Sequence, residues 1–246
     1  MYFLVKKDLD EGLLDVGKTT QFLSKIQTIM TNSILEIINP IMRKFDVIVN
    51  RFVTGRFELD SLLNDFKTIY RSILPYLKYT DSINNFLMKI LNTKLEHKMV
   101  SKIMTNPNRF VFSNAINWNS FISAFISDER VEMEMLHELI AILMMAQNLS
   151  MEPSILKDIS HHFTPNQVGF IMKNYKPDMM IPKPIDYSEF AKFYRIKEIE
   201  TRIKIPEPPF PDIEEAKAGL VLENWNKLKV DQNVLKEFPW LKNYCE

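Results

Sequence analysis

The stretch ILKDISHHFTPNQVGFIMKNYKPDMMIPKPIDYSEF, residues 155–190, shows most directly how this chain folds. Thr164 can accept a backbone N–H as a helix N-cap, Pro165 suits the first helical position, and Gln167 completes a capping box. Four apolar side chains follow at helical spacing, Val168, Ile171, Met172 and Tyr175. Because Pro177 prevents continuation, the sequence predicts a short helix with one apolar face.

An extended connector, MMIPKPI at 179–185, follows this helix. Its prolines hold the residues before them in β or polyproline geometry. Asp186 and Glu189 then have the spacing of a second capping box. We therefore expect another helix from Tyr187 to about Ile203.

Upstream of this stretch, apolar residues recur at helical spacing over long windows, and acidic residues face outward. The predicted helices are 20–40, 41–52 after a break at Pro40, 57–74, 81–104, one with Ser113 as N-cap, one after Asp128, and 153–162. The helix after Asp128 is expected to point Glu132, Glu134 and Glu138 to solvent. The sequence therefore predicts an all-α fold, an elongated bundle of antiparallel amphipathic helices.

The composition narrows the classes of protein to which the chain can belong. Hydrophobic residues make up 46% of the 246 residues, which is ordinary for a globular protein. Lys plus Arg and Asp plus Glu both total 31, so no net charge favours nucleic acid. Cys245 is the single cysteine, which excludes an internal disulfide and suits the reducing cytosol. We find no signal peptide or membrane-length apolar run, and expect no membrane insertion.

One motif suggests a nucleotide-binding site. GLLDVGKT, residues 12–19, satisfies the Walker A pattern, in which Lys18 would contact phosphates and Thr19 would bind Mg²⁺. A P-loop follows a buried strand, however, whereas here KKDLDE separates the apolar MYFLV from Gly12, and the downstream chain is helical. The favoured interpretation is a turn at Gly17 leading into a helix, and a P-loop nucleotide-binding protein remains an alternative.

Other chemical motifs are incomplete. His137-Glu138 begins like a zinc-protease helix, but Ala141 occupies the position of the second histidine. His161 and His162 are adjacent and cannot bind one metal from a single helix face. We therefore expect no catalytic, metal or cofactor site, and no enzyme activity.

The pattern divides the chain into a lead-in at 1–19, the least helical part, a helical domain at 20–203, and a C-terminal region at 204–246. KIPEPPFPD at 204–212 contains four prolines in nine residues and predicts an extended arm. A polar helix at 213–228 and an aromatic tail are expected to follow. The residues expected to anchor this region on the helical body are Phe210, Trp225, Phe238 and Trp240. Folding on binding a partner is the alternative.

Taken in order, several segments between residues 59 and 200 resemble the dilute (DIL) domain, the C-terminal half of the cargo-binding globular tail of class V myosins. They are LDSLLNDFKTIYRSILPYLKYTDSINNFLMKILNTKL, FVFSNAINWNSF, LHELIAILMMAQNL, ILKDISHHFTPNQVGFIMKNY and IPKPIDYSEFAKFYRI. The matching positions are Asn114, Phe121, the Ile140–Leu149 helix, Phe163, Thr164, Pro165, Gln167, Val168 and Tyr175. Ser113 and Ala115 depart from the pattern, so the resemblance is to a divergent or isolated DIL domain, or to a fragment of a longer motor.

The resemblance implies a non-catalytic domain that binds adaptor proteins on organelles or vesicles, and other parts of a myosin heavy chain, and links cargo to actin-based transport. It implies a cytoplasmic location with cytoskeleton or vesicle association. Peptide partners are expected in grooves beside the helix at 164–175 and under the proline-rich arm, with no residue singled out. A DIL-containing scaffold and a vesicle-tethering subunit are alternatives with the same fold.

Overall fold

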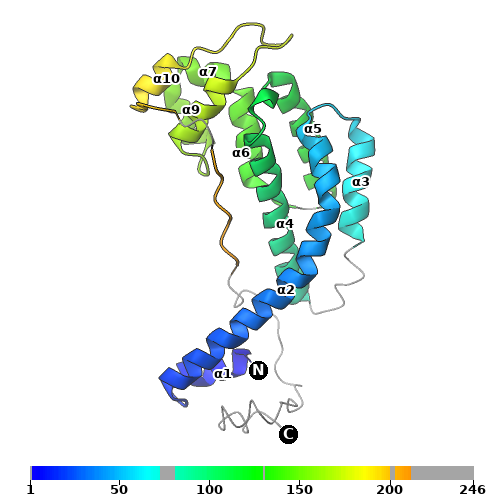
Figure 1. The fold of residues 1–246 in the computed structure, drawn as a ribbon, viewed down its shortest axis with the longest axis vertical. Helices are drawn as coiled ribbons and strands as arrows, with labels where there is room; N and C mark the ends of the chain where they lie inside the picture. Colours follow the sequence, from blue (N-terminus) through cyan, green and yellow to red (C-terminus); the bar gives the residue numbers. More distant parts are fainter. Residues whose placement is uncertain (1, 73–80, 130, 200–202, 212–246) are drawn as a thin grey trace. The chain divides into compact units, whose positions relative to one another are not determined.

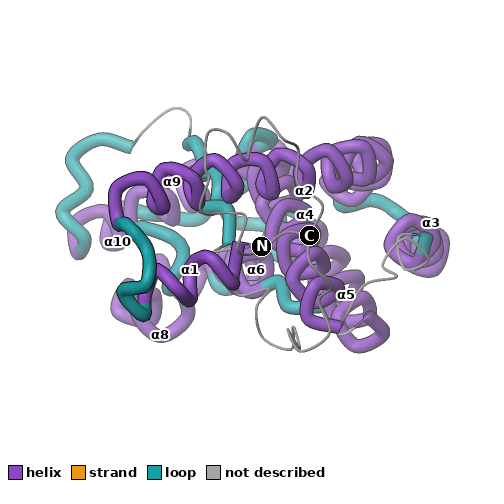
Figure 2. Tube along the Cα trace, turned by 90° about the horizontal axis from the view of Figure 1, so that it is seen from below, coloured by secondary structure: helices purple, strands orange, loops and turns teal. Residues whose placement is uncertain are grey.

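The computed structural model describes residues 2–72, 81–129, 131–199 and 203–211, and in these ranges it is all-α, a multi-helix bundle with no strand (Figures 1 and 2). The α-helices are α1 (Tyr2–Asp10), α2 (Val16–Val53), α3 (Leu59–Arg71), α4 (Asp81–Met104), α5 (Phe112–Glu129), α6 (Glu134–Met144), α7 (Ala146–Met151), α8 (Leu156–Ile159), α9 (Pro165–Asn174) and α10 (Ser188–Phe193). Two 3₁₀ helices, η2 (Pro107–Arg109) and η3 (Pro153–Ile155), join them. The predicted fold class is confirmed.

The chain divides into two compact units. Unit 1 comprises residues 1–37, 78–87 and 211–246, and unit 2 comprises 38–77 and 88–210. In unit 1, residues 2–10 form α1, so the prediction that the N-terminal stretch is the least helical is wrong. The predicted polar helix and aromatic tail, with Trp225, Phe238, Trp240 and Cys245, lie outside the described residues.

The core of unit 2 is an aromatic cluster where α2, α3 and α5 meet. Its rings have centroid separations between 4.8 and 6.1 Å and belong to Phe52, Phe57, Phe66, Trp118, Phe121 and Phe125. The indole Nε1 of Trp118 donates to the carbonyl of Phe52 at 2.7 Å, so the largest buried ring leaves no polar atom unpaired. This cluster fixes α5 against α2 and α3.

The predicted helices are largely confirmed, with differences in α2. The apolar stripe of α4 is buried from Phe86 to Ile103, and its bounds match the prediction. Helix α2 runs without a break through Pro40, and the predicted break is wrong. Because Pro40 is exposed, water can replace the backbone hydrogen bond that its missing N–H cannot make. Ile29, predicted to lie in the apolar stripe, is 64% exposed.

Helix α9 begins with the predicted capping box. Thr164 Oγ1 accepts from the N–H of Gln167, and the side-chain oxygen of Gln167 accepts from the N–H of Thr164 at 2.8 Å. The predicted stripe from Val168 to Tyr175 is buried. Gly169 and Phe170 are buried as well, so α9 is covered on more than the one face that the sequence predicted.

Thr164→Ala is expected to lower the free energy of unfolding by about 1 kcal/mol, because the backbone N–H of Gln167 in the first turn of α9 loses its capping acceptor. Urea denaturation followed by circular dichroism measures the change. Thr164→Ser keeps the hydroxyl and is expected to stay within about 0.5 kcal/mol of the wild type. An equal loss in both variants would contradict the capping role.

Helix α10 is much shorter than predicted. It ends at Phe193 rather than near Ile203, because Arg195 adopts a left-handed conformation with φ 55°. The N–H of Ile196 bonds to Ala191 O at 2.8 Å and that of Arg195 to Lys192 O at 3.2 Å, which is a Schellman C-cap. The helix therefore stops, and the chain continues without helical structure.

The chain after α10 lies across α9. A Cβ added to Gly169 would meet the side-chain tips of Ile196 at 3.2 Å and Ile199 at 3.4 Å. The prediction of a helix through this region is wrong because these isoleucines pack against α9 instead of continuing a helical stripe. The predicted second capping box is also wrong. Asp186 accepts from the N–H of Ser188 at 2.9 Å, and α10 begins without a capping side chain.

Arg195→Gly is expected to raise the free energy of unfolding by about 1 kcal/mol, because glycine adopts the left-handed conformation without a Cβ clash. Thermal unfolding of the full chain measures this as a higher Tm. Lys197→Gly, outside the left-handed position, is the matched control and is expected to give no increase. A lower Tm for Arg195→Gly would contradict the role of this position as a helix C-cap.

Two helices begin with a backbone N–H that is bonded to a carboxylate far away in the sequence. Ser113 was predicted as an N-cap, but α5 begins at Phe112 and the N–H of Ser113 donates to Asp178 Oδ2 at 2.7 Å. At α6, the N–H of Leu136 donates to Glu96 at 3.0 Å. Burial raises the pKa of Glu96, and the hydrogen bonds from α6 act in the opposite direction.

Glu138 was predicted to point outward, but its side chain is only 14% exposed. Oε2 accepts from the N–H groups of His161 and His162, both at 2.9 Å, and from Ser160 Oγ at 3.1 Å. Oε1 lies 2.8 Å from Nδ1 of His162. The chain therefore turns at 160–162, and the helix predicted for 153–162 is instead η3 followed by α8, which ends at Ile159.

Candidate functional site

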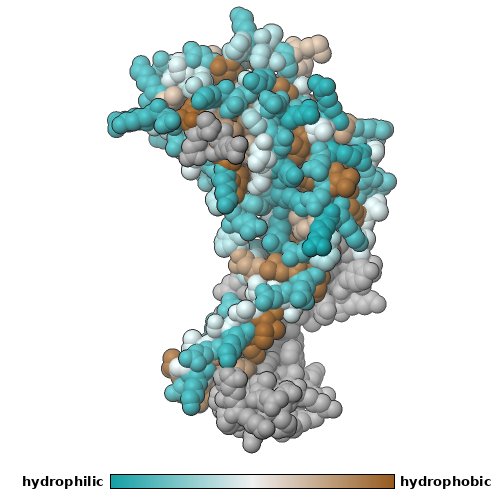
Figure 3. Space-filling model, in the orientation of Figure 1, coloured by the Kyte–Doolittle hydropathy of each residue, from teal (hydrophilic) through white to brown (hydrophobic). Residues whose placement is uncertain are grey.

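Unit 2 contains an open groove of about 1230 Å³. Its floor is one face of α4, where His97, Ser101, Met104 and Thr105 recur at helical spacing. Phe170 of α9 closes one end. The face of unit 2 in Figure 3 is mostly hydrophilic, with hydrophobic residues in patches between hydrophilic ones. We call this concavity the α4 groove.

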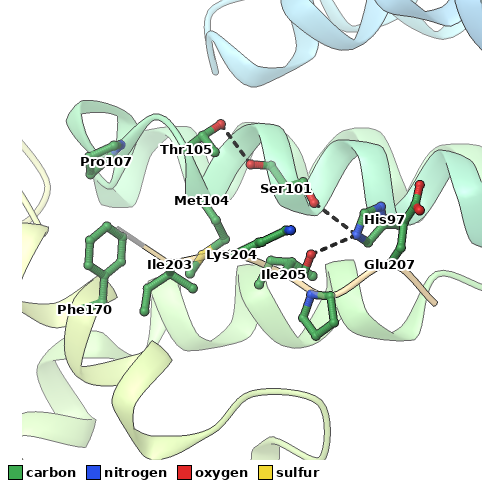
Figure 4. A pocket seen from close by; sticks show the side chains of 11 residues that line it. His97, Ser101, Met104, Thr105, Pro107, Phe170, Ile203, Lys204, Ile205 and Glu207 are labelled. Carbon is green, nitrogen blue, oxygen red and sulfur yellow. Dashed lines mark hydrogen bonds between the residues drawn. The ribbon is translucent and has the colours of Figure 1, made fainter. Parts of the chain in front are cut away.

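We call residues 203–210 the arm, and its first five residues, 203–207, form one wall of the α4 groove. Ile203 and Ile205 are buried, whereas Lys204 between them is exposed, as expected for an extended chain whose side chains alternate. Figure 4 shows the arm beside α4, with His97, Ser101 and Thr105 on the helix and Phe170 at the end. The prolines that follow, at 206, 208 and 209, keep the preceding residues extended.

One polar contact joins the arm to α4. His97 Nε2 lies 3.2 Å from the carbonyl oxygen of Ile205, and with its hydrogen on Nε2 the ring donates to that carbonyl. Ser101 Oγ lies 3.3 Å from the same nitrogen. The groove therefore recognises a backbone carbonyl as well as apolar side chains (Figure 4).

A second cavity of about 540 Å³ continues the α4 groove along the helix. It shares His97, Ser101, Thr105 and Glu207 of the arm with the first, and adds the lysines of α4 at positions 94, 98 and 102. Lys98 forms an ion pair with Asp46 and donates to the carbonyl of Met42. The extension of the groove is therefore basic, and the arm presents an acidic residue to it.

We expect the arm to be held on α4 by only a small net free energy. Burying Ile203 and Ile205 contributes about 1.5–3 kcal/mol each, and the bond from His97 adds about 1 kcal/mol. Fixing the backbone of residues 203–207 costs about 1–2 kcal/mol per residue. The favourable and unfavourable sums are of the same size, so a competing segment need supply only a small advantage.

The Walker-like stretch has a different structural role. Gly12 has φ 75°, and the bonds from Gly12 N to Leu9 O and from Leu13 N to Asp8 O form the Schellman cap of α1. The turn is therefore at Gly12, and the predicted turn at Gly17 is wrong, since Gly17 lies inside α2.

The next helix begins within the same motif. Asp15 Oδ1 accepts from the N–H of Lys18 at 3.1 Å, as an N-cap of α2 does. Thr19 is buried. Helix α1 stands where a P-loop requires a strand, and the backbone N–H of Lys18 already has a partner. Helix capping therefore accounts for Gly12 and Asp15 of GLLDVGKT.

The histidines singled out in the sequence are not assembled around a metal. Within the described ranges, no group of three or more His, Cys, Asp or Glu side chains is placed to hold one. His137, Glu138 and Ala141 line a shallow cavity of about 320 Å³, and Glu138 is engaged with the 160–162 turn. The search of the described helices for a segment of membrane-spanning length and hydropathy found none.

The residues that carry the DIL resemblance lie mostly in the core. Asn114 is buried and donates from Nδ2 to Arg109 O at 2.9 Å, and Phe121 belongs to the aromatic cluster. Tyr175 ends α9, and its buried hydroxyl has no hydrogen-bond partner in the described part of the chain. Burial raises the pKa of this hydroxyl. These positions therefore support packing, and sequence reasoning named none of the residues that line the α4 groove.

A signal for the groove floor was present in the sequence. His97, Ser101 and Thr105 place polar side chains at i, i+4 and i+8 of α4, beside the apolar stripe. Sequence alone does not show that the arm reaches this face. Comparison of the chain with protein-family models, curated proteins and solved structures found no match in any of the three.

Proposed function

We propose that this chain is a non-catalytic protein-binding domain that holds adaptor proteins of organelles or vesicles. In this proposal it works as the cargo-binding globular tails of class V myosins do, in the cytoplasm, and links cargo to actin-based transport. The sequence resemblance over residues 59–200 suggests the class of partner. The all-α architecture agrees with that resemblance.

The observation that carries the proposal is an extended segment that already lies along α4 and forms one wall of the α4 groove. Ile203 and Ile205 are buried there, and His97 bonds a carbonyl of the same segment. Extended, proline-containing segments that dock in grooves are a common form of peptide recognition. The groove therefore has the features that a docking site for a partner segment needs.

A scaffold or a vesicle-tethering subunit with the same fold would use the same groove. The three roles differ in what accompanies the partner. A transport motor tail brings an actin motor and an organelle adaptor into one complex, whereas a tether joins two membranes without a motor. The composition of the captured complex therefore separates them.

Affinity capture with the tagged full chain from the cells that produce it, followed by mass spectrometry, tests the proposal. We expect organelle or vesicle adaptors together with an actin motor. Thr105→Arg adds bulk and charge at an exposed position of the groove and is expected to lose the adaptors. Gln147→Arg places the same change on an exposed position of α7 and is expected to retain them.

Two results would contradict the proposal. One is recovery of no adaptor by a wild-type chain whose helical circular dichroism is intact. The other is equal recovery by Thr105→Arg and Gln147→Arg, which would place the binding surface elsewhere. Adaptors recovered without a motor would favour the scaffold or the tether.

A further inference from the structure

The arm indicates what kind of partner segment the α4 groove accepts. We propose that the groove binds, in competition with the arm, an extended partner segment of the form aliphatic–any–aliphatic–proline–acidic. This inference rests on the proposed function and specifies the chemistry of its partner. The arm itself has this form in Ile203-Lys204-Ile205-Pro206-Glu207.

The two aliphatic positions follow from burial. Ile203 and Ile205 are 7% and 8% exposed, whereas Lys204 faces solvent. Met104 of α4 and Phe170 of α9 line the groove there and are themselves buried, so the surface on which the isoleucines lie is apolar. An extended partner must therefore place apolar side chains at alternate positions, with an exposed residue between them.

The proline position follows from the backbone. The carbonyl of Ile205 is the group that His97 bonds, and the next residue, Pro206, is exposed. A proline restrains the residue before it to extended geometry, which orders the segment before it binds. It also has no N–H, so it brings no donor that needs a partner in the groove.

The acidic position follows from charge. Lys94, Lys98 and Lys102 recur every four residues along α4 and line the same cavity as Glu207. Lys98 is already paired with Asp46, which leaves the outer two lysines facing this cavity with no ion pair recorded among the described residues. An acidic residue after the proline therefore places opposite charges in one cavity.

The arm competes with a free partner segment for the α4 groove, and its covalent link to the groove favours the arm. A tethered segment has a high local concentration at its own groove, so a free segment of equal intrinsic affinity binds the wild-type chain weakly. Weakening the arm removes this competition. The affinity of the groove for a free segment is therefore expected to rise when the arm is altered.

The test uses a fluorescein-labelled peptide with the sequence of residues 203–211, IKIPEPPFP, and the full chain. Fluorescence anisotropy is expected to give a Kd about tenfold lower for Ile203→Ser/Ile205→Ser than for the wild type. Ile205→Ser alone is expected to lie between them and serves if the double variant does not fold. Adding Thr105→Arg to the weakened-arm chain is expected to abolish the gain, and adding Gln147→Arg is expected to preserve it.

Peptide variants test the recognition pattern. A peptide with serine at both isoleucine positions is expected not to bind, and one with lysine in place of Glu207 is expected to bind about threefold more weakly at low salt. Absence of binding to the weakened-arm chains would overturn the proposal. So would equal binding of the IKIPEPPFP and serine peptides.

A second copy of this chain is the other possible source of such a segment. A wild-type dimer that dissociates in Ile203→Ser/Ile205→Ser, measured by light scattering, would identify the arm of a second copy as the occupant and overturn the proposal. Failure of peptide binding with adaptor capture intact would reject this recognition pattern alone. Peptide binding without adaptor capture would reject the adaptor role alone.

Discussion

Gly55→Ala is expected to lower the free energy of unfolding of unit 2 by about 3 kcal/mol. Gly55 joins α2 to α3 with φ 67°, a conformation that costs an L-residue about 1–2 kcal/mol. An added Cβ would also lie 2.2 Å from the side-chain amide of Asn114. In Gly55→Ala, the cost of the left-handed backbone and the cost of the overlap with Asn114 therefore add.

The turn at Gly55 cannot shift easily, because side chains on one face of α5 are hydrogen-bonded to its backbone. Asn117 Nδ2 donates to the carbonyl of Gly55 at 2.8 Å, and Trp118 Nε1 donates to that of Phe52 at 2.7 Å. Asn114, Asn117 and Trp118 stand at i, i+3 and i+4. Moving the turn away from Asn114 would therefore break two hydrogen bonds and disturb the aromatic cluster.

Urea denaturation of the full chain, read by tryptophan fluorescence and circular dichroism, measures the change. Gly12→Ala is the matched control, because Gly12 has φ 75° but nothing within 4 Å of an added Cβ. It is expected to cost only the conformational part, about 1 kcal/mol. Equal losses for the two variants would contradict the steric role of Asn114.

A double-mutant cycle isolates the overlap. Asn114→Gly removes the side chain that an alanine at position 55 would meet, at its own cost in helix propensity and in the bond to Arg109. We expect a coupling energy of about 1–2 kcal/mol between the two substitutions. Strict additivity would show that backbone strain alone makes Gly55 necessary.

Glu138→Gln is expected to lower the free energy of unfolding by about 2 kcal/mol at neutral pH, because charge-assisted hydrogen bonds to one carboxylate weaken together. The carboxylate accepts from Ser160, His161 and His162 and fixes the turn between α8 and α9. Equilibrium denaturation measures the loss. Glu132→Gln, at an exposed position before α6, is expected to change stability by less than about 0.5 kcal/mol.

The difference between wild type and Glu138→Gln also depends on pH. Burial acts to raise the pKa of Glu138, but hydrogen bonds from His162 and His161 outweigh it and hold the pKa below its ordinary 4.5. A carboxylate with a lowered folded-state pKa contributes stability that is fully present above the unfolded pKa. That contribution is lost as the pH falls from about 4.5 through the folded pKa. A difference that stays constant down to pH 2 would contradict this account.

How well the sequence predicted the structure depended on how far apart the interacting groups are. The Thr164 capping box and the bounds of α4 were predicted and observed, since each rests on residues within a few turns. The end of α10 was missed because Arg195 in the left-handed conformation is an exception to the preference for glycine. Within the α4 groove, the sequence predicted an extended arm and a groove beneath it, and it named no lining residue.

The sequence by itself determined the all-α architecture, the capped start of α9 and the bounds of α4, because helical periodicity and short-range caps are fixed by backbone geometry over a few residues. Only the tertiary structure decided which carboxylate caps which helix start, as Asp178 does for α5 and Glu96 for α6. It also decided that the carbonyl of Ile205 lies beside His97. These contacts join residues 40 to 108 positions apart, and their formation depends on the packing of whole helices rather than on any local pattern.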